Sequence, residues 1–419
     1  MSPTRPRLTL LVALLATVAS VGVWSQNLPT AKPEDVGLSS ERLSRMDRAI
    51  HAYVDAGRTP GVVTLVARHG KVVHVDAYGK ANLTSGRATR ADDLFRMYSM
   101  TKPITSAALL VLYEEGKFQL TDPLSLYFPA FVDVKVYAGT GPQGGMLLDA
   151  PRRPITVQDV FRHTAGLTYG LFGATPVDKM YQDVDVLATD LNGLMEKLPK
   201  LPLLYQPGER WVYSVAHDVQ AALVEKLSGQ KFDAFVRQRV FGPLGMKDSM
   251  FKVPADKMPR LPALYAMGRD GKLAVDTSPL GRNYGDVVFG GYSISTTIGD
   301  YALFAQMLLN KGQLNGARLL SPKTVELMAM NHLPASAMAG GGAGPGVGYG
   351  LGVSVLLSPA ERGNVGSVGE FGWSGAAATH VLIDPKEDLI ALYCTQLMFG
   401  DFALRSEFVT LLYQAIVGS

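Results

Sequence analysis

A serine and a lysine three residues apart could perform nucleophilic chemistry in this chain. In the run Ser99-Met100-Thr101-Lys102, the spacing places the hydroxyl and the amine on one face of a helix. A serine hydroxyl is a weak nucleophile, so it needs a proton acceptor beside it and hydrogen-bond donors where negative charge develops on the substrate oxygen. We therefore take Ser99 as a candidate nucleophile and Lys102 as a candidate proton acceptor.

The same spacing occurs twice more, at residues 228–231 and 249–252, and the surrounding sequence separates the three cases. Only Ser99 precedes a long apolar run, residues 103–110, which predicts a helix that buries the Lys102 side chain. Burial favours the neutral amine of a lysine, which can accept a proton. The first N–H groups of such a helix can also bind an oxyanion.

The run F-R-M-Y-S-M-T-K at residues 95–102 resembles the nucleophile motif of the class C β-lactamase-like superfamily. This superfamily includes β-lactamases, DD-peptidases and family VIII carboxylesterases. Further segments resemble its motifs in the expected order: Asp122-Pro123-Leu124, H-T-A-G-L at residues 163–167, Tyr213-Ser214-Val215, G-G-Y-S-I-S-T at residues 290–296, and Trp373-Ser374-Gly375. The ordered set covers nearly all of the chain after residue 25 and is more specific than any one member.

The resemblance implies a role for each matching position. Ser99 would be acylated, Lys102 and Tyr213 would form the proton-transfer pair, and the oxyanion would lie between the backbone N–H groups of Ser99 and Ala376. Whether Lys102 or Tyr213 is the acylation base stays open, since the base is disputed across such enzymes. The resemblance implies no metal and no organic cofactor.

Two departures from the β-lactamase pattern bear on the substrate. In class C β-lactamases the second motif ends in Asn and the third begins with Lys, whereas this chain has Val215 and Trp373. We expect Val215, Trp373 and Gly375 to contact substrate, and an apolar, aromatic wall suits a small uncharged ester. The W-x-G pattern resembles the family VIII carboxylesterases, so a carboxylesterase acting on short acyl chains is the favoured function.

Other interpretations stay open at this point. The same machinery could serve a β-lactamase or a D-amino-acid peptidase, and a catalytically silent cell-wall-binding protein would keep the fold alone. Tyr213 could be a core aromatic residue, and Trp373 could pack beneath a strand. We expect His163 to be structural, because a Ser-His-Asp triad needs geometry that spacing cannot supply. His217 and Asp218 are expected to orient the Tyr213 segment.

The periodicity predicts the elements that must position these residues. Helices are predicted over residues 38–56, 99–115, 298–309, 322–330 and 402–417, and strands over residues 62–68, 72–78, 350–356, 376–383 and 389–394. Residues 121–282 show short helical patterns, and the glycine-rich stretch 340–352 is expected to be a surface loop.

Strands at both ends with helices between them predict one sheet built from both halves of the chain and interrupted by a helical domain. The resemblance implies an α/β (α+β) fold of the serine β-lactamase/DD-peptidase type, an antiparallel sheet flanked by helices with an inserted helical domain. Residues 26–109 and 286–419 would form the sheet domain, and residues 110–285 the helical domain.

Composition limits the partners and the compartment. A net charge of +3 over 419 residues, with no run of basic residues, argues against a nucleic acid partner. Residues 1–25 have the pattern of a cleaved signal peptide, with two arginines before an apolar run, so we expect an exported, periplasmic or secreted protein with no stable membrane span after cleavage. The single cysteine, Cys394, excludes an intramolecular disulfide. The oligomeric state stays open.

Overall fold

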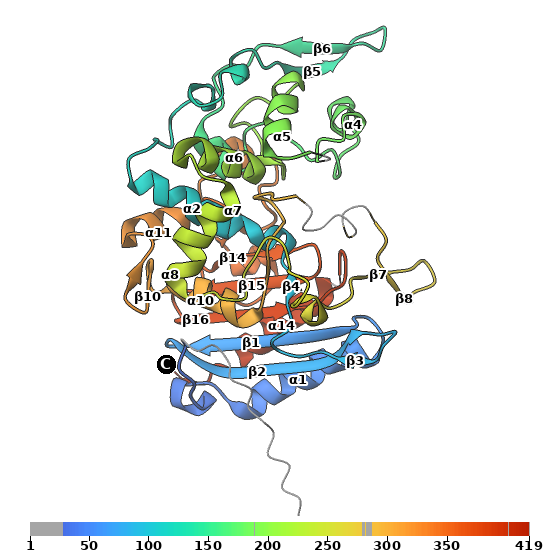
Figure 1. Ribbon diagram of the computed structural model, residues 1–419, viewed down its shortest axis with the longest axis vertical. Coiled ribbons are helices and arrows are strands. Elements are labelled where there is room, and N and C mark those ends of the chain that lie inside the picture. Colours follow the sequence, from blue (N-terminus) through green and yellow to red (C-terminus); the bar gives the residue numbers. More distant parts are fainter. Residues whose placement is uncertain (1–27, 188, 279–280, 282–286, 401, 419) are drawn as a thin grey trace, which may run out of the picture.

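The computed structural model describes residues 28–187, 189–278, 281, 287–400 and 402–418 (Figure 1). The predicted signal peptide, residues 1–25, and the predicted domain boundary at residue 285 lie outside the described residues. Within the described part, no helix has the length and apolar character needed to cross a bilayer.

The centre of the molecule is an eight-stranded antiparallel sheet built from both ends of the chain, as predicted. Its strand order is β12-β13-β14-β15-β16-β1-β2-β3. The bounds are β1 Gly61–Arg68, β2 Lys71–Asn82, β3 Arg87–Ala88, β12 Val347–Tyr349, β13 Ser354–Leu356, β14 Phe371–Gly375, β15 Thr379–Asp384 and β16 Leu389–Cys394. The pairing of β1 with β16 joins the two ends of the sequence, because Val63 lies opposite Cys394.

The strands predicted over residues 62–68 and 72–78 form the hairpin of β1 and β2. His69 and Gly70 both have positive φ, 52° and 70°. A two-residue turn with positive φ at both central positions matches the right-handed twist of the strands that it joins. The hairpin therefore follows from local sequence.

Helices cover both faces of this sheet. Their bounds are α1 Ser40–Asp55, α2 Thr101–Glu114, α3 Val157–Phe161, α4 Pro176–Asp183, α5 Leu191–Lys197, α6 Ala216–Ser228, α7 Phe232–Val236, α8 Gly242–Leu244, α10 Ile298–Leu309, α11 Pro322–Met328, α12 Ala335–Ala339, α13 Pro359–Arg362 and α14 Phe402–Gln414. Side chains alternate between the two faces of β1. Val62 and Val66 pack with α1 and α14, whereas Val63 and Leu65 belong to the larger core that includes α2, α6 and α10.

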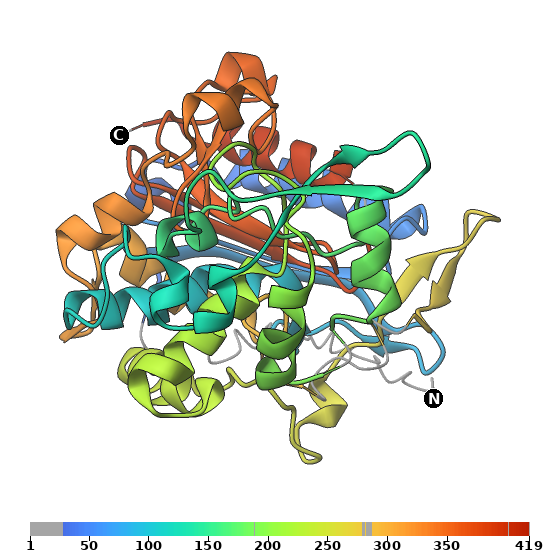
Figure 2. The same ribbon diagram turned by 90° about the horizontal axis from the view of Figure 1, so that it is seen from above.

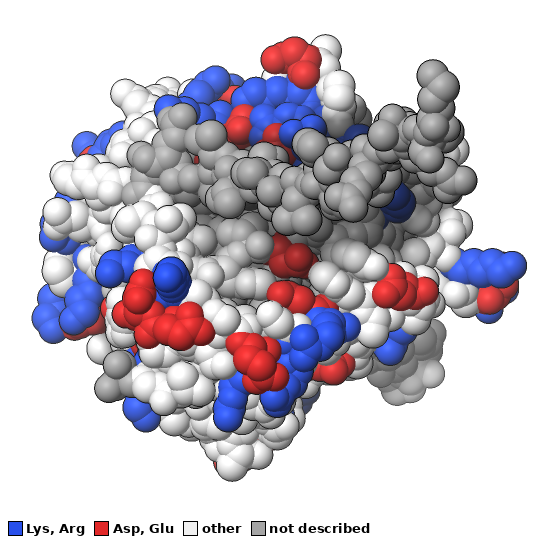
Figure 3. All heavy atoms as spheres, turned by 90° about the horizontal axis from the view of Figure 1, so that it is seen from below, with Lys and Arg blue, Asp and Glu red and all other residues white. Residues whose placement is uncertain are grey.

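The helices between α2 and α8 lie on the side of the sheet opposite α1 (Figures 1 and 2). Helix α2 packs against α6, so the segment that follows Ser99 contacts the segment that follows Tyr213. The division into domains at residue 110 stays a prediction, and α2 crosses it. On the face seen from below, acidic and basic side chains lie beside one another (Figure 3).

Several short strands were missed. Two hairpins, β5 Val136–Thr140 with β6 Met146–Asp149 and β7 Tyr265–Met267 with β8 Leu273–Val275, interrupt the region that was expected to be helical. The glycine-rich stretch that was expected to be a loop contains the edge strand β12, and β14 had no strand prediction. These strands are three to five residues long, too short for a period of two to stand out.

Candidate active site

Ser99 lies in a tight turn and not at the first position of a helix. It is the middle residue of a 3₁₀ turn, Tyr98–Met100, and α2 begins at Thr101, two residues later than predicted. Tyr98 has a φ of 43°, a left-handed conformation that costs a residue with a Cβ atom about 1–2 kcal/mol. The segment is held by pairing of β4 (Phe95–Arg96) with β9 (Ser295–Thr296). Strain of this kind, held in place by pairing on the preceding strand, is common at functional sites.

Lys102 contacts Ser99 as the three-residue spacing predicts. Its Nζ donates to Ser99 Oγ at 3.2 Å and to the carbonyl oxygen of Gly291 at 2.9 Å. The lysine side chain is fully buried. The amine is therefore positioned to exchange a proton with the serine hydroxyl.

The two other Ser-x-x-Lys runs form no such contact. Ser228 Oγ donates to the carbonyl oxygen of Val224, and Lys231 is exposed just before α7. Ser249 Oγ bonds to Asp300, and its lysine is exposed as well. Sequence context distinguished the three runs correctly.

Tyr213 joins the pair from a distant part of the chain. It lies just before α6, and the centroid of its ring is 4.5 Å from Lys102 Nζ. Trp373 Nε1 donates to the Tyr213 hydroxyl at 3.4 Å. Ser99, Tyr213 and Trp373 line the same cavity. The structure thus places Lys102 next to both Ser99 and the ring of Tyr213, and the serine and the tyrosine line one cavity.

The end of β14 packs directly on the backbone that leads to Ser99. A Cβ atom at Gly375 would lie 2.2 Å from the carbonyl oxygen of Met97, so only glycine fits there without movement. This contact brings Ala376 to the cavity beside Ser99. Their pairing as oxyanion donors stays a prediction that this arrangement permits.

Val215 does not lie where the sequence interpretation placed it. Its side chain is fully buried in the hydrophobic core at the start of α6, and it is not among the described residues that line the cavity. Val215 therefore packs in the core behind the cavity wall, and the expectation that it contacts the substrate directly is corrected.

His163 lies in a second layer behind Tyr213. Its Nδ1 is 3.1 Å from Ser214 Oγ, and its ring packs against those of Trp211, Tyr213 and Tyr349. Burial, together with the nearby positive charge of Lys102, holds the pKa of the imidazole well below 6.5. A neutral, buried histidine packed on aromatic rings fits the structural role expected of it.

Asp218 occupies the same layer on α6. It is fully buried, and its Oδ1 accepts from the N–H of Gly291 at 2.7 Å. Burial raises the pKa of this carboxyl to about 7, against the opposing influence of Lys102. The sequence interpretation expected Asp218 to orient the tyrosine segment, whereas its hydrogen bond goes to the backbone of Gly291.

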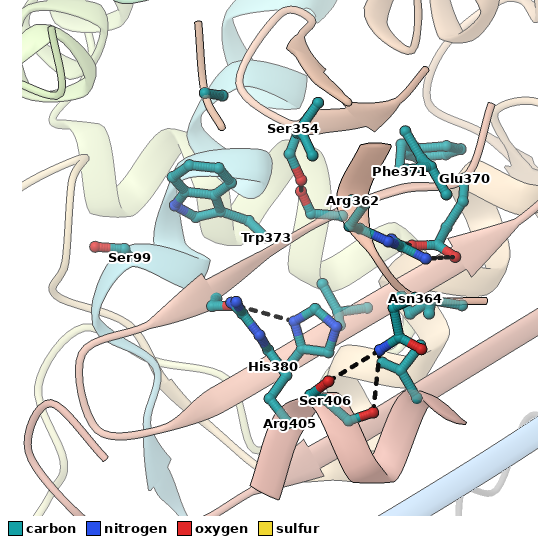
Figure 4. Close-up of a pocket in the computed structure, with 18 of the residues that line it drawn as sticks. Ser99, Ser354, Arg362, Asn364, Glu370, Phe371, Trp373, His380, Arg405 and Ser406 are labelled. Carbon is teal, nitrogen blue, oxygen red and sulfur yellow. Dashed lines mark hydrogen bonds and ion pairs between the residues drawn. The ribbon is translucent and has the colours of Figure 1, made fainter. Parts of the chain in front are cut away.

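The cavity has a volume of about 530 Å³ and two chemically different ends (Figure 4). Near Ser99, its walls are aromatic and small apolar side chains, including Phe172, Tyr213, Trp373 and Ala376. The other end is polar and is lined by residues of α13, of the loop between α13 and β14, and of α14, including Arg362, Asn364, Glu370, Arg405 and Ser406. Such a cavity can hold a substrate that has an uncharged part near the nucleophile.

Phe172 is a wall residue that sequence reasoning missed. Its side chain is 63% exposed, yet its ring centroid is 5.9 Å from that of Tyr213. A phenylalanine in a glycine-flanked loop gives little signal, because an isolated apolar residue in a loop is common. The run Leu171-Phe172 between two glycines was the available clue.

Comparisons with known proteins identify the family of the chain. A family model described as Beta-lactamase matches residues 46–414. Protein Rv1367c of Mycobacterium tuberculosis is 34% identical over 357 residues, which cover 83% of this chain and 88% of the relative. Esterase EstB of Burkholderia gladioli is 35% identical over 212 residues, which cover 50% of this chain and 51% of EstB.

Solved structures have the same fold. EstCE1, described as a hydrolase with promiscuous acyltransferase activity, gives a TM-score of 0.76 at 22% identity, over 89% of this chain and 99% of EstCE1. A class C beta-lactamase gives a TM-score of 0.68 at 17% identity, over 91% of this chain and 98% of the other. The predicted fold is confirmed. The chain belongs to the beta-lactamase family and is a serine hydrolase of that fold.

Proposed function

We propose that the protein is a carboxylesterase that cleaves small, uncharged esters with short acyl chains through an acyl-enzyme on Ser99. The observation that carries this proposal is the aromatic wall beside the nucleophile. Trp373 occupies the position of the β-lactamase lysine, and its ring centroid is 5.6 Å from that of Tyr213. An uncharged indole there offers no ionic partner for the carboxylate of a β-lactam, whereas it suits an apolar acyl or alkyl group.

The proposed reaction has two proton-balanced steps. Ser99 Oγ attacks the ester carbonyl carbon, and its proton passes to the pair formed by Lys102 and Tyr213. The ester C–O bond breaks, and the leaving alcohol takes the proton from the pair. Water then attacks the acyl-enzyme, with the same pair accepting its proton and returning it to Ser99 as the acid leaves. The backbone N–H groups of Ser99 and Ala376 would stabilise the oxyanion in both steps.

Substrate comparison tests this proposal. The purified protein should hydrolyse p-nitrophenyl butyrate faster than a chromogenic cephalosporin, and Ser99→Ala should abolish the turnover. Faster turnover of the cephalosporin would favour the β-lactamase alternative. Release of D-alanine from a D-alanyl-D-alanine peptide would favour the peptidase.

We also propose that the protein is exported. The apolar run that follows Arg5 and Arg7 supports a signal peptide. N-terminal sequencing of the protein from the periplasm or the culture medium should begin after residue 25, and an intact Met1 on cytoplasmic protein would contradict export.

A further inference from the structure

Asp218 is a buried carboxyl group with one unused oxygen. Its Oδ1 accepts from the Gly291 N–H at 2.7 Å, and its Oδ2 has no hydrogen-bond partner within the described part of the chain. A buried carboxylate with an unsatisfied oxygen costs several kcal/mol unless a positive charge lies nearby. The proposed reaction of Ser99, Lys102 and Tyr213 does not use this group.

One residue links Asp218 to Lys102. The N–H of Gly291 donates to Asp218, and the carbonyl oxygen of the same residue accepts from Lys102 Nζ at 2.9 Å. A Cβ atom at position 291 would lie 2.9 Å from both Asp218 Oδ1 and the Tyr169 hydroxyl. The carboxyl group therefore packs tightly against the residue whose carbonyl oxygen binds the lysine.

The charges of Asp218 and Lys102 also influence one another. Burial is the main reason why the carboxylate of Asp218 is unfavourable, and Lys102 is the largest of the groups that stabilise it. In the low dielectric of the interior, the ammonium form of Lys102 and the carboxylate form of Asp218 stabilise one another.

We propose that Asp218 is a positioning residue for Lys102: it fixes the carbonyl group that binds the amine, and its negative charge stabilises the ammonium that forms when Ser99 is acylated. The proposal rests on the role of Ser99 and Lys102 in the proposed function. When the Ser99 O–H bond breaks, the oxygen electron pair forms the bond to the acyl carbon, and the proton reaches Nζ directly or through Tyr213. Asp218 itself keeps its charge throughout and touches no reacting atom.

The groups that face Asp218 come from several elements. Lys102 on α2 and Tyr169 in the loop before α4 interact with Asp218. Tyr213 and Tyr292 lie around Tyr169, and His217 is the residue that precedes Asp218 on α6. Burial keeps the pKa of His217 well below 6.5 and that of Tyr169 well above 10. His217 and Tyr169 therefore add no charge change near neutrality.

Ionisation of Asp218 should then make the rate of Ser99 modification depend on pH, with an acidic limb on which the rate falls as the pH is lowered. Burial raises its pKa to about 7, so the carboxylate is present above that pH and is lost below it. If the anion stabilises the ammonium, the rate of serine modification falls by ~10-fold per pH unit below about pH 7. A purely structural carboxyl group would leave this rate independent of its own ionisation.

The rate of phosphonylation by a fluorophosphonate, followed by intact mass between about pH 5 and 9, tests the proposal. Asp218→Asn keeps an oxygen that can accept from Gly291 but removes the charge. We expect the variant to lose the acidic limb and to react about 10- to 100-fold more slowly than the parent at high pH. A variant with the parent's rate and limb, or one that is uniformly slower with the limb retained, would overturn the proposal.

Asp300→Asn provides the matched control. Asp300 is a mostly buried carboxyl group whose pKa burial raises to about 6, and it accepts from the Asp248 N–H at 2.7 Å near the start of α10. This variant should keep the limb near pH 7. If Asp218→Asn does not fold, the pH profile of the parent protein still tests the proposal, because a modification rate that is constant from about pH 5 to 8 contradicts it.

The outcomes also separate this inference from the proposed function. A parent protein that takes the adduct on Ser99 but shows no acidic limb would overturn only the role of Asp218. A parent protein with no adduct at any pH would overturn both.

Discussion

Replacing Gly375 with alanine tests whether the end of β14 must pack directly on the segment that carries the nucleophile. The new Cβ atom would lie 2.2 Å from the Met97 carbonyl oxygen, and real Cβ atoms essentially never approach closer than 3.0 Å. Both atoms belong to backbone segments, so the two segments must separate by roughly 0.8 Å. The separation should move the N–H of Ala376 away from the oxyanion that it is proposed to bind.

The expected effect is on the chemical step. A misplacement of about 1 Å at a reacting centre costs about 10²-fold, close to the effect of removing one oxyanion donor. We therefore expect Gly375→Ala to lower kcat for p-nitrophenyl butyrate by about 10²-fold, equivalent to about 2.7 kcal/mol. KM should change little, because the substitution removes neither of the aromatic wall residues Phe172 and Trp373. Steady-state kinetics on folded protein measures both values.

Gly350→Ala is the matched control. Its Cβ atom would also lie 2.2 Å from a backbone oxygen, that of Met328, but at the β12 edge of the sheet. It should lower thermal stability by a similar amount and leave kcat within a few-fold of the parent value. If Gly375→Ala keeps the parent kcat, or if both variants lose kcat equally, the reasoning about β14 is refuted.

Three further predictions concern the proton acceptor, the pocket wall and acid stability. Lys102→Met should lower kcat/KM by about 10²- to 10⁴-fold, whereas Lys231→Met, at the same spacing from another serine, should have no effect. If Lys102→Met keeps the kcat/KM of the parent protein, Lys102 takes no part in proton transfer. Phe172→Ala should raise KM for a butyrate ester by about 10-fold, and Leu171→Ala, which is exposed but does not line the cavity, should not; an unchanged KM would remove Phe172 from the substrate wall. Burial raises the pKa of Asp159, but hydrogen bonds from two arginines and a threonine outweigh this effect and leave it at about 2. Because the pKa of Asp159 in the folded state lies below the unfolded value of 3.8, its ionised carboxylate stabilises the fold above pH 3.8, and this stabilisation is lost as the pH falls through about 2. Asp159→Asn should therefore lower the free energy of unfolding at neutral pH by about 2 kcal/mol. Urea unfolding at several pH values measures this loss, and an unchanged pH dependence would contradict it.

Local geometry made part of the site predictable. The contact between Ser99 and Lys102 depends on a three-residue spacing and an apolar helix, which the sequence displays directly. Tyr213 was identified only through resemblance, because no local rule connects a tyrosine with a serine 114 residues earlier. The hydrogen bond of Asp218 to Gly291 was missed for the same reason, since it joins α6 to a distant loop.

The fold was predictable where periodicity was long enough to read. The helix over residues 298–309 and the strand over residues 389–394 have the predicted bounds. Strand β14 was missed because two glycines in five residues weaken its pattern, although one of them is needed for the contact with Met97. Val215 was assigned to the pocket by its motif position, and only packing revealed that its side chain points into the core. Tertiary contacts decide such positions.

Trapping the acyl-enzyme tests the central claim most directly. The protein is mixed with excess p-nitrophenyl butyrate, quenched in acid during turnover, digested and analysed by mass spectrometry. We predict a butyryl group on Ser99 in the parent protein, and neither adduct nor turnover in Ser99→Ala. A butyryl group on a different residue, or undiminished turnover by Ser99→Ala, would contradict the account.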